Sequence, residues 1–252
     1  MNICVCICSY KRPLVKTLKY IPYAKVFIDK KEEKEYREAN EKIDLHICDD
    51  GIQGNVSRVR NYMLDTMFAE GFDAVCLLDD DIKTINRFEV NGFFGYEKKK
   101  VPTEQFMYFL QMGTRLCEEW GYKLWGINCN SDPMSYRHYT PFSTKGFIGG
   151  PFNVHLKSDI RYDESLPLKE DYDLVLQHAN KYRGVLRLNM YHYECEQATN
   201  TGGCAMYRTG SKEEEQFNLL QKKWGSKIVQ RDKGSRRKND FNPIIKIPIG
   251  GV

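Results

Sequence analysis

The chain has 252 residues, of which 41% are hydrophobic and 29% charged, and its formal net charge is +4. These values are typical of an ordinary globular domain with ample length to bury a core. No apolar run approaches the ~18 residues of a membrane span, and the N-terminus lacks the basic start of a signal peptide, so we expect a cytoplasmic protein without a membrane partner. Nine cysteines without a CxxC pair fit a reducing compartment.

The first half of the chain alternates between predicted strands and helices. Apolar runs predict strands at residues 2–9, 24–29, 44–48 and 74–78. Helices are predicted between them at 14–21, 30–42 and 57–70, the last on the helical spacing of its apolar residues. This rhythm favours a parallel sheet that is covered by helices on both sides.

The second half is predicted to be less regular. It holds predicted helices at 103–120, 170–182 and 211–224, the last opening at Ser211, and strands at 124–129, 147–157 and 185–193. The tail is basic: residues 227–238 hold six basic residues and one acidic residue, which leaves the rest of the chain at −1. We therefore expect a catalytic domain at 1–225 and a basic C-terminal segment at 226–252.

Two acidic clusters follow predicted strands, namely Asp49-Asp50 and Asp79-Asp80-Asp81. In an open parallel sheet, ligands bind at the carboxyl ends of the strands. Three adjacent carboxylates repel one another unless a cation neutralises them. Asp79 and Asp81 are therefore candidate ligands of Mg²⁺ or Mn²⁺ beside a diphosphate, with a solvated turn or a helix cap as the plain structural alternative.

Three later features carry further candidate chemistry. The glycines of 146–150 allow a ligand to approach the backbone closely, although a β-bulge explains them equally well. Asp171 near a helix start is a candidate general base toward a hydroxyl, or a helix cap. His192 at a strand end is a candidate Mn²⁺ ligand, or a buried ring.

Taken in order, these motifs resemble those of GT-A fold glycosyltransferases. That family shares a strand followed by Asp-x-Asp, a Gly-rich segment, Glu-Asp at a helix start and a late His, which match Asp79/Asp81, 146–150, Glu170-Asp171 and His192. The motifs at 9–13, 49–51 and 54–61 resemble the nucleotide-binding half of family-2-like members. The resemblance covers about residues 3–195 and implies a Rossmann-like mixed sheet with helices on both faces.

Within that fold, the chain resembles the TET-associated glycosyltransferases of phages. The matching segments are 57–61, 78–82, 149–153 and 201–204. That group adds sugars to hydroxymethylated pyrimidines in DNA, which implies a DNA acceptor and a host cytoplasm if the chain comes from a phage. The charge of the basic segment then makes Arg236, Arg237 and Lys238 candidates for holding the DNA, with a solvated disordered tail as the alternative. The chain departs from polysaccharide synthases, since it has neither a Gln-x-x-Arg-Trp motif nor a membrane helix.

The resemblance also implies a role for each candidate residue. Asp171 would be the catalytic base, and its position points to inversion, although retaining enzymes keep the same motif. Mn²⁺ or Mg²⁺ would be held by Asp79, Asp81 and His192. The nucleotide of a donor, expected to be a UDP-sugar, would contact Ser9, Tyr10, Arg12, Asp50, Arg58, Asp80, Gly149 and Gly150.

Other functions fit parts of the pattern. A glycosyltransferase acting on a glycan or protein acceptor would carry the same motifs. A nucleotidyltransferase of the same fold would also bind a metal and a nucleotide, but only Lys11-Arg12-Pro13 stands where its Gly-rich phosphate loop is expected. A metal-dependent nuclease and an inactive binding module are further alternatives. Nothing in the sequence indicates a protein partner.

Overall fold

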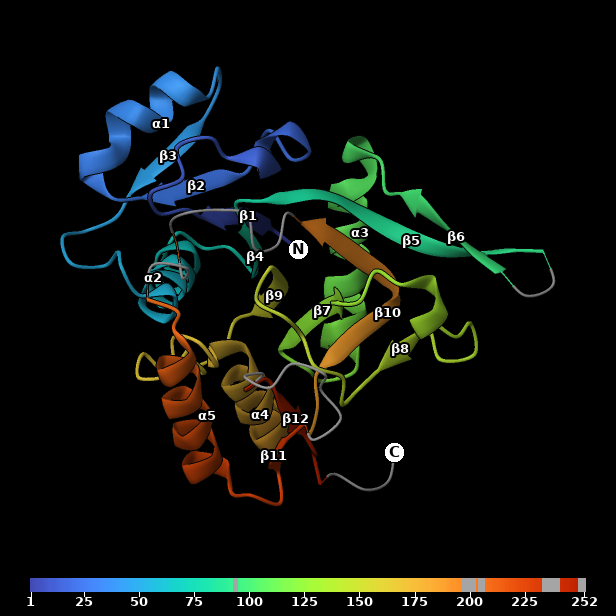
Figure 1. Ribbon diagram of the computed structural model, residues 1–252. Coiled ribbons are helices and arrows are strands. Elements are labelled where there is room, and N and C mark those ends of the chain that lie inside the picture. The colour runs from blue at the N-terminus through green and yellow to red at the C-terminus, as the bar shows by residue number, and fades with distance from the viewer. Residues whose placement is uncertain (93–94, 196–202, 204–206, 233–240, 249–252) are drawn as a thin grey trace.

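The computed structural model describes residues 1–92, 95–195, 203, 207–232 and 241–248. Its central feature is a ten-stranded mixed sheet with the order β3-β2-β1-β4-β9-β7-β10-β5-β6, to which β8 adds by pairing with β10 (Figure 1). The predicted fold class, a mixed α/β sheet with helices on both faces, is confirmed.

The first half of the chain forms the parallel part of the sheet. Its strands are β1 (Ile3–Cys8), β2 (Lys25–Ile28), β3 (Asp44–Ile47) and β4 (Ala74–Asp79). The connections between them contain η1 (Lys16–Lys19), η2 (Lys30–Glu32), α1 (Glu33–Ala39) and α2 (Val56–Ala69). Cys8 pairs with Asp79, so β1 and β4 end side by side at one edge of the sheet.

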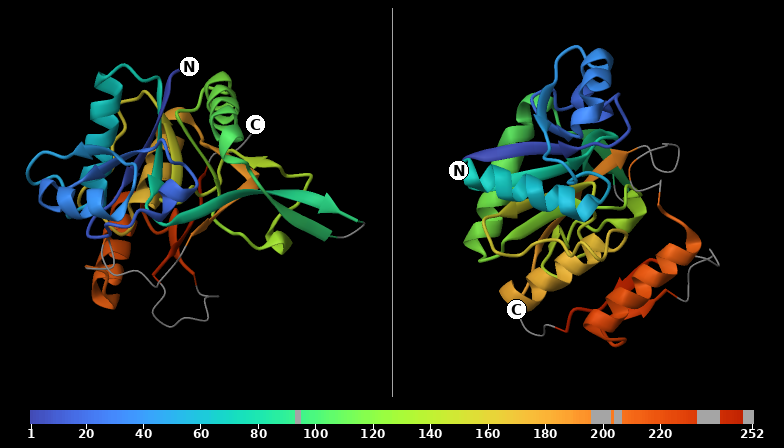
Figure 2. Two further views of the ribbon diagram at one scale, coloured as in Figure 1. Left: turned by 90° about the horizontal axis from the view of Figure 1, so that it is seen from above. Right: turned by 90° about the vertical axis from the view of Figure 1, so that its left-hand side faces the viewer.

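The second half adds mostly antiparallel strands. Strand β9 (Phe152–Leu156) lies antiparallel between β4 and β7 (Leu124–Asn128), and β10 (Leu186–Cys195) runs parallel to β7. Strands β5 (Ile82–Asn91) and β6 (Gly95–Lys100) form an antiparallel pair that extends away from the body of the molecule (Figures 1 and 2). The remaining elements are α3 (Thr103–Glu119), η3 (Pro133–Ser135), β8 (Phe142–Ser143), α4 (Glu170–Tyr182), α5 (Gly210–Trp224), β11 (Val229–Arg231) and β12 (Pro243–Ile245).

Each face of the sheet packs against its own apolar core. On one face, Cys4 and Cys6 of β1 contact the cluster that includes Met63 of α2 and Val175 of α4. On the other face, Ile7 of β1 belongs to the cluster that includes Phe106 of α3. The alternation of side chains along β1 thus separates two helical layers, as expected for a strand covered on both sides.

The C-terminal part packs outside α4. Leu176 of α4, Leu220 of α5 and Val229 of β11 belong to one small apolar cluster, and α5 lies beside α4 in Figure 1 and in the right-hand view of Figure 2. The division at residues 225/226 stays a prediction. Among the described residues, no helix combines the length and apolar character needed to cross a membrane.

Two local expectations differ from the structure. The helix expected at 14–21 is reduced to the short η1, because the Thr17 backbone N–H donates to the Asp80 carbonyl at 3.2 Å instead of to a preceding turn of helix. Helix α5 is capped by Thr209, whose hydroxyl accepts a hydrogen bond from the Lys212 N–H at 3.2 Å, and not by Ser211.

Candidate active site

A cavity of about 640 Å³ opens where β1 and β4 end. Its size is in the range of small-molecule sites. Several donor-site and catalytic residues predicted from the sequence line it together: Ser9, Tyr10, Arg12, Asp79, Asp80, Asp81, Gly149, Gly150 and Asp171. Segments that are 160 residues apart in the chain therefore meet at one edge of the sheet.

The turn between β4 and β5 presents the three aspartates in fixed directions. The hydroxyl of Thr17 donates to the Asp79 carbonyl at 2.7 Å and accepts from the Ile82 N–H at 2.9 Å. Asp80 is turned toward β1: it accepts from the Ser9 hydroxyl at 2.6 Å and from Arg12 Nη1 at 2.9 Å. Burial raises the pKa of Asp80, against the opposing effect of these two partners.

Asp79 and Asp81 both line the cavity, and their carboxylates suit a cation. Within the described ranges, no three His, Cys, Asp or Glu side chains converge in the way that a protein-only metal site requires. Mg²⁺, however, is commonly held by one or two carboxylates together with substrate phosphates and water, and Mn²⁺ also favours oxygen ligands. Two carboxylates beside an open cavity therefore fit either ion.

Arg60 on α2 joins the two sides of the cavity. It is 2% exposed. Its Nη2 donates to Asp79 Oδ1 at 2.9 Å and to the Gly150 carbonyl at 3.1 Å, while its Nη1 donates to Glu170 Oε1 at 3.0 Å. The sequence analysis missed this residue. The available signal was its position four residues after Val56 and three before Met63, on the apolar stripe of the helix, where an arginine needs buried partners.

Asp171 lies at the start of α4 with its carboxyl group beside the glycine segment. Its Oδ2 accepts from the Gly150 N–H at 3.3 Å, and its Oδ1 accepts from the Tyr172 N–H at 2.9 Å. Burial raises the pKa of Asp171. Burial, with the neighbouring Asp171 charge, also raises the pKa of Glu170 to about 8. A carboxylate with a raised pKa is a stronger base near neutral pH, as general base catalysis requires.

The two central glycines give room to side chains of the protein itself. A Cβ on Gly150 would lie 3.0 Å from Arg60 Nη1 and Nη2. A Cβ on Gly149 would lie 2.8 Å from Cys129 Sγ and 2.9 Å from the Tyr193 hydroxyl. In this structure the two glycines thus seat Arg60 and Tyr193 against the backbone, and the approach of a ligand to this segment stays a prediction.

Three predicted site residues lie apart from the cavity lining. Asp50 is exposed beyond the end of β3. Arg58 donates through Nε to the Ile52 carbonyl at 3.1 Å. His192 is fully buried, and its ring stacks on Phe88 with a centroid distance of 4.4 Å. The predicted DNA contacts Arg236, Arg237 and Lys238 lie outside the described residues.

The C-terminal half contributes a further group of lining residues that the sequence analysis did not name. The rings of Phe147 and Tyr172 stack with a centroid distance of 4.2 Å. Arg208 also lines the cavity. Its Nε donates to Glu213 at 3.0 Å, and Glu213 also pairs with the buried Lys169. Phe147 and Tyr172 stand next to predicted motifs but had no predicted role, and no local motif marks Arg208, which directly precedes α5.

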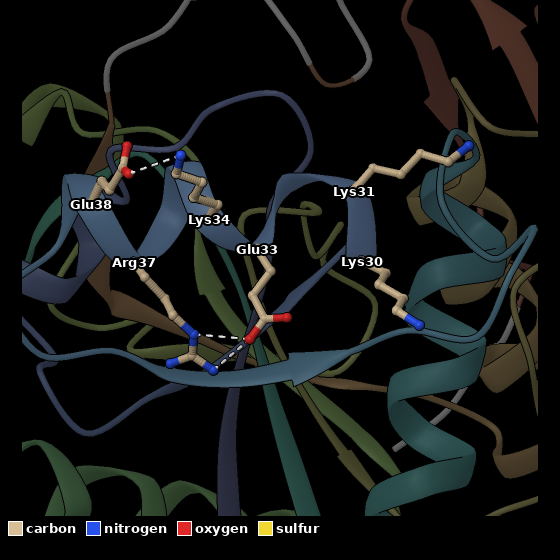
Figure 3. Close-up of a pocket in the computed structure, with 6 residues that line it drawn as sticks. All are labelled: Lys30, Lys31, Glu33, Lys34, Arg37 and Glu38. Carbon is tan, nitrogen blue, oxygen red and sulfur yellow. Dashed lines mark hydrogen bonds and ion pairs between the residues drawn. The ribbon is translucent and has the colours of Figure 1, made fainter.

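A second hollow lies on the outer surface of η2 and α1 (Figure 3). Its charges are partly paired within the helix, since Arg37 contacts Glu33 at 2.8 Å and Lys34 contacts Glu38 at 3.8 Å. Among the residues that the structure describes, none from the ends of β1 or β4 reaches it. Its lining in this part of the chain consists of Lys30, Lys31, Glu33, Lys34, Arg37 and Glu38.

No protein-family model matches the sequence, and no curated protein matches it either. A solved structure, residues 1–349 of TarS from S. aureus, matches the fold with a TM-score of 0.50 and 13% identity. The match covers 87% of this chain but only 64% of that one. The fold is GT-A. The mixed sheet is therefore that of a known architecture.

Two further solved structures are similar at lower scores. Glucosyl-3-phosphoglycerate synthase from Mycobacterium tuberculosis, in complex with Mn²⁺, UDP-glucose and phosphoglyceric acid, has a TM-score of 0.48 and 10% identity over 92% of this chain and 84% of that one. A putative nucleotide-diphospho-sugar transferase from Desulfovibrio desulfuricans has a TM-score of 0.42 and 11% identity, over 89% and 99% of the two chains.

Proposed function

We propose that the protein is a glycosyltransferase that moves a sugar from a nucleotide-diphosphate donor, a UDP-sugar, to a hydroxyl acceptor. The observation that carries this proposal is one cavity that is lined by Asp79 and Asp81 from the end of β4 and by Asp171 from the start of α4. The first two carboxylates suit a cation beside a diphosphate, and the third, with its raised pKa, suits proton removal from a hydroxyl.

The donor would lie along the edge of β1 and β4. Ser9, Tyr10 and Arg12 would contact the nucleotide, and Asp79 and Asp81 would hold Mn²⁺ or Mg²⁺. When bound, the ion neutralises charge on the departing nucleoside diphosphate. His192, as a third ligand, stays a prediction, as do the donor contacts of Asp50 and Arg58.

The acceptor would lie beside Asp171, whose carboxylate takes the proton of the attacking hydroxyl. This oxygen then bonds to the anomeric carbon of the sugar as the bond to the nucleoside diphosphate breaks. The position of Asp171 in the Glu170-Asp171 motif at the start of α4 points to inversion in a single displacement, although a retaining enzyme can keep the same motif. The products would be the glycosylated acceptor and UDP.

We propose DNA that carries a hydroxymethylated pyrimidine as the acceptor. Two features support it: the sequence resemblance to TET-associated glycosyltransferases, and the net charge of +5 on residues 227–238 beside a nearly neutral remainder. Lysine and arginine side chains that neutralise phosphates release counterions, which gives sequence-independent affinity for DNA. A base inside a duplex cannot reach Asp171, so the enzyme would use single strands or flip the base out.

The deciding experiment offers labelled UDP-sugars with Mn²⁺ and four acceptors: DNA with 5-hydroxymethylcytosine, unmodified DNA, a simple sugar and a protein. We expect label only on the modified DNA, with UDP as the released nucleotide. Label on the sugar or protein alone would remove the DNA proposal and keep the glycosyltransferase. In a parallel reaction with UTP and a sugar 1-phosphate, formation of a UDP-sugar with release of pyrophosphate would instead indicate a nucleotidyltransferase.

A second experiment tests the basic tail. Replacing Arg236, Arg237 and Lys238 together by Gln should weaken DNA binding alike for all sequences. If each residue neutralises one phosphate of duplex DNA, the slope of log K against log salt should flatten by roughly 2–3. Donor binding should be unchanged. An unaltered salt slope would show that the tail does not hold the DNA.

A further inference from the structure

A buried polar network of Asn153, His155 and Tyr162 contacts the glycine segment at Gly150. These three residues are not part of the cavity lining. The side-chain amide of Asn153 donates to the Gly150 carbonyl at 3.1 Å, beside the bond from Arg60 to the same oxygen. On its other side, Asn153 Oδ1 accepts from the Tyr162 hydroxyl at 3.1 Å and lies 2.9 Å from His155 Nε2. Asn153 and His155 are each 2% exposed and Tyr162 is 3% exposed.

The Gly150 residue therefore has both of its backbone polar groups bonded to side chains. Its carbonyl is held by Arg60 and Asn153, and its N–H points to Asp171 Oδ2. Gly150 belongs to no strand, and the neighbouring Pro151 carbonyl accepts a backbone hydrogen bond from the Asp79 N–H at 3.1 Å. The bonds from Arg60 and Asn153 to the Gly150 carbonyl hold the peptide unit next to the one whose N–H points to Asp171, and so restrict the position of that N–H.

From this geometry we infer that Asn153 is a positioning residue for Asp171 and acts through the Gly150 backbone. The inference rests on the proposed role of Asp171 as the base. The orientation of the Asn153 amide is set by its surroundings: its NH₂ must meet a carbonyl, and its oxygen must meet the donors on Tyr162 and His155. A displacement of about 1 Å in a catalytic group costs on the order of a hundredfold in rate, so loosening this residue should slow transfer.

The kinetic test uses Asn153→Leu, which keeps the approximate size and removes both hydrogen-bonding sides. We expect kcat to fall between about tenfold and a hundredfold, with KM for the donor within roughly twofold of its original value. Tyr162→Phe removes only one donor and keeps the ring, so it should fold well and lower kcat less. Thr114→Val is the control, because it removes another buried hydrogen bond, to Trp125, that has no link to Asp171.

A double-mutant cycle separates positioning from general destabilisation. If Asn153 acts through Asp171, then adding Asn153→Leu to Asp171→Asn should cause no further loss of the residual kcat. A further tenfold loss in that background, or an equal loss of kcat in Thr114→Val, would overturn the inference.

Hydrogen–deuterium exchange decides the structural part without any substrate. In Asn153→Leu and Tyr162→Phe, we expect faster deuterium uptake by peptides covering 146–152 and 170–172, and no such change in Thr114→Val. Unchanged uptake at 146–152 would overturn the inference. If the unmodified protein transfers no sugar from any donor, the proposed function fails, and this exchange measurement alone decides whether Asn153 holds Gly150 against Asp171.

Discussion

The cavity has two walls that hold the same side-chain type in different surroundings. On the β4 wall, Asp79 is partly exposed and pairs with Arg60, and the neighbouring Asp80 is bonded to Arg12 and Ser9. On the α4 wall, Asp171 accepts only backbone N–H groups among its described hydrogen bonds, and burial raises its pKa. Different environments give one type of group different tasks, here cation binding and proton removal.

Arg60 connects the two walls, because it bonds to Asp79 on the β4 wall and to Glu170 on the α4 wall. We expect Arg60→Met to reduce donor binding and transfer together, and to destabilise the fold by about 3–5 kcal/mol, the usual cost of removing one partner from a buried ion pair. Melting temperature, UDP binding and transfer are the measurements.

Arg58→Met is the matched control on the same helix. Arg58 is 39% exposed and lies 4.0 Å from Glu164, and an exposed pair of this kind contributes at most ~1 kcal/mol. Equal melting temperatures for Arg58→Met and Arg60→Met would contradict the linking role of Arg60.

Asp171→Asn should affect the α4 wall alone. We expect transfer to fall by ~10²-fold or more, because a general base is lost, while UDP-sugar affinity stays nearly unchanged. Asp173→Asn is the control two residues further along. Asp173 is fully buried and bonded to Trp224 and Lys223, so its change should lower stability and spare kcat. If Asp171→Asn instead loses donor affinity and keeps full transfer, the roles assigned to the two walls are wrong.

Asp81→Asn should affect the β4 wall alone. Mn²⁺ and UDP together should raise the melting temperature of the original protein by more than the sum of their separate effects, because each favours the binding of the other. Asp81→Asn should abolish this excess. The same assay tests His192. A smaller excess in His192→Ala would support its role as a metal ligand, and an unchanged excess would mean that His192 is a buried ring that binds no metal.

The two walls also differ in how far the sequence predicts them. The β4 wall follows from local patterns, since apolar strands at 2–9 and 74–78 end directly at Ser9 and Asp79. The alternation of strands and helices then brings those ends together. The residues that orient the aspartates are harder to predict from the sequence. Thr17, which lies in a segment expected to be a helix, holds the aspartate turn through its hydroxyl.

The α4 wall depends on long-range packing, and the sequence predicts only its most local part. Glu170-Asp171 at a helix start is recognisable, but its contacts with Gly150 and Arg60 join segments far apart in the chain. The β5–β6 pair was not predicted at all. Its residues mix charged and apolar side chains, and its stability comes from pairing with β10 rather than from a strong pattern of its own.

A further expected effect concerns pH and distinguishes the α4 wall through Glu170. Burial, and second the charge of Asp171, raise the pKa of Glu170 in the folded protein to about 8, above the ordinary glutamate value of 4.5. Between these values the folded state binds more protons than the unfolded state, so stability must fall as pH rises from about 5 to 8. Glu170→Gln keeps an acceptor for Arg60 and removes the titration.

We therefore expect Glu170→Gln to melt near the original temperature at pH 5 and above it at pH 8, with EDTA present to exclude metal effects. For a chain of this size, each 1 kcal/mol corresponds to roughly 2–4 °C. Asp163→Asn is the control of opposite sign. Burial acts to raise the pKa of Asp163, but hydrogen bonds from Lys223 and Ser165 lower it overall. The ionised carboxyl group therefore stabilises the fold at pH 5 as well as at pH 8. Its loss should lower the melting temperature equally at both pH values. If Glu170→Gln instead behaves like Asp163→Asn, then Glu170 is ionised in the folded protein at pH 5, and the α4 wall does not hold a carboxyl group of raised pKa beside Asp171.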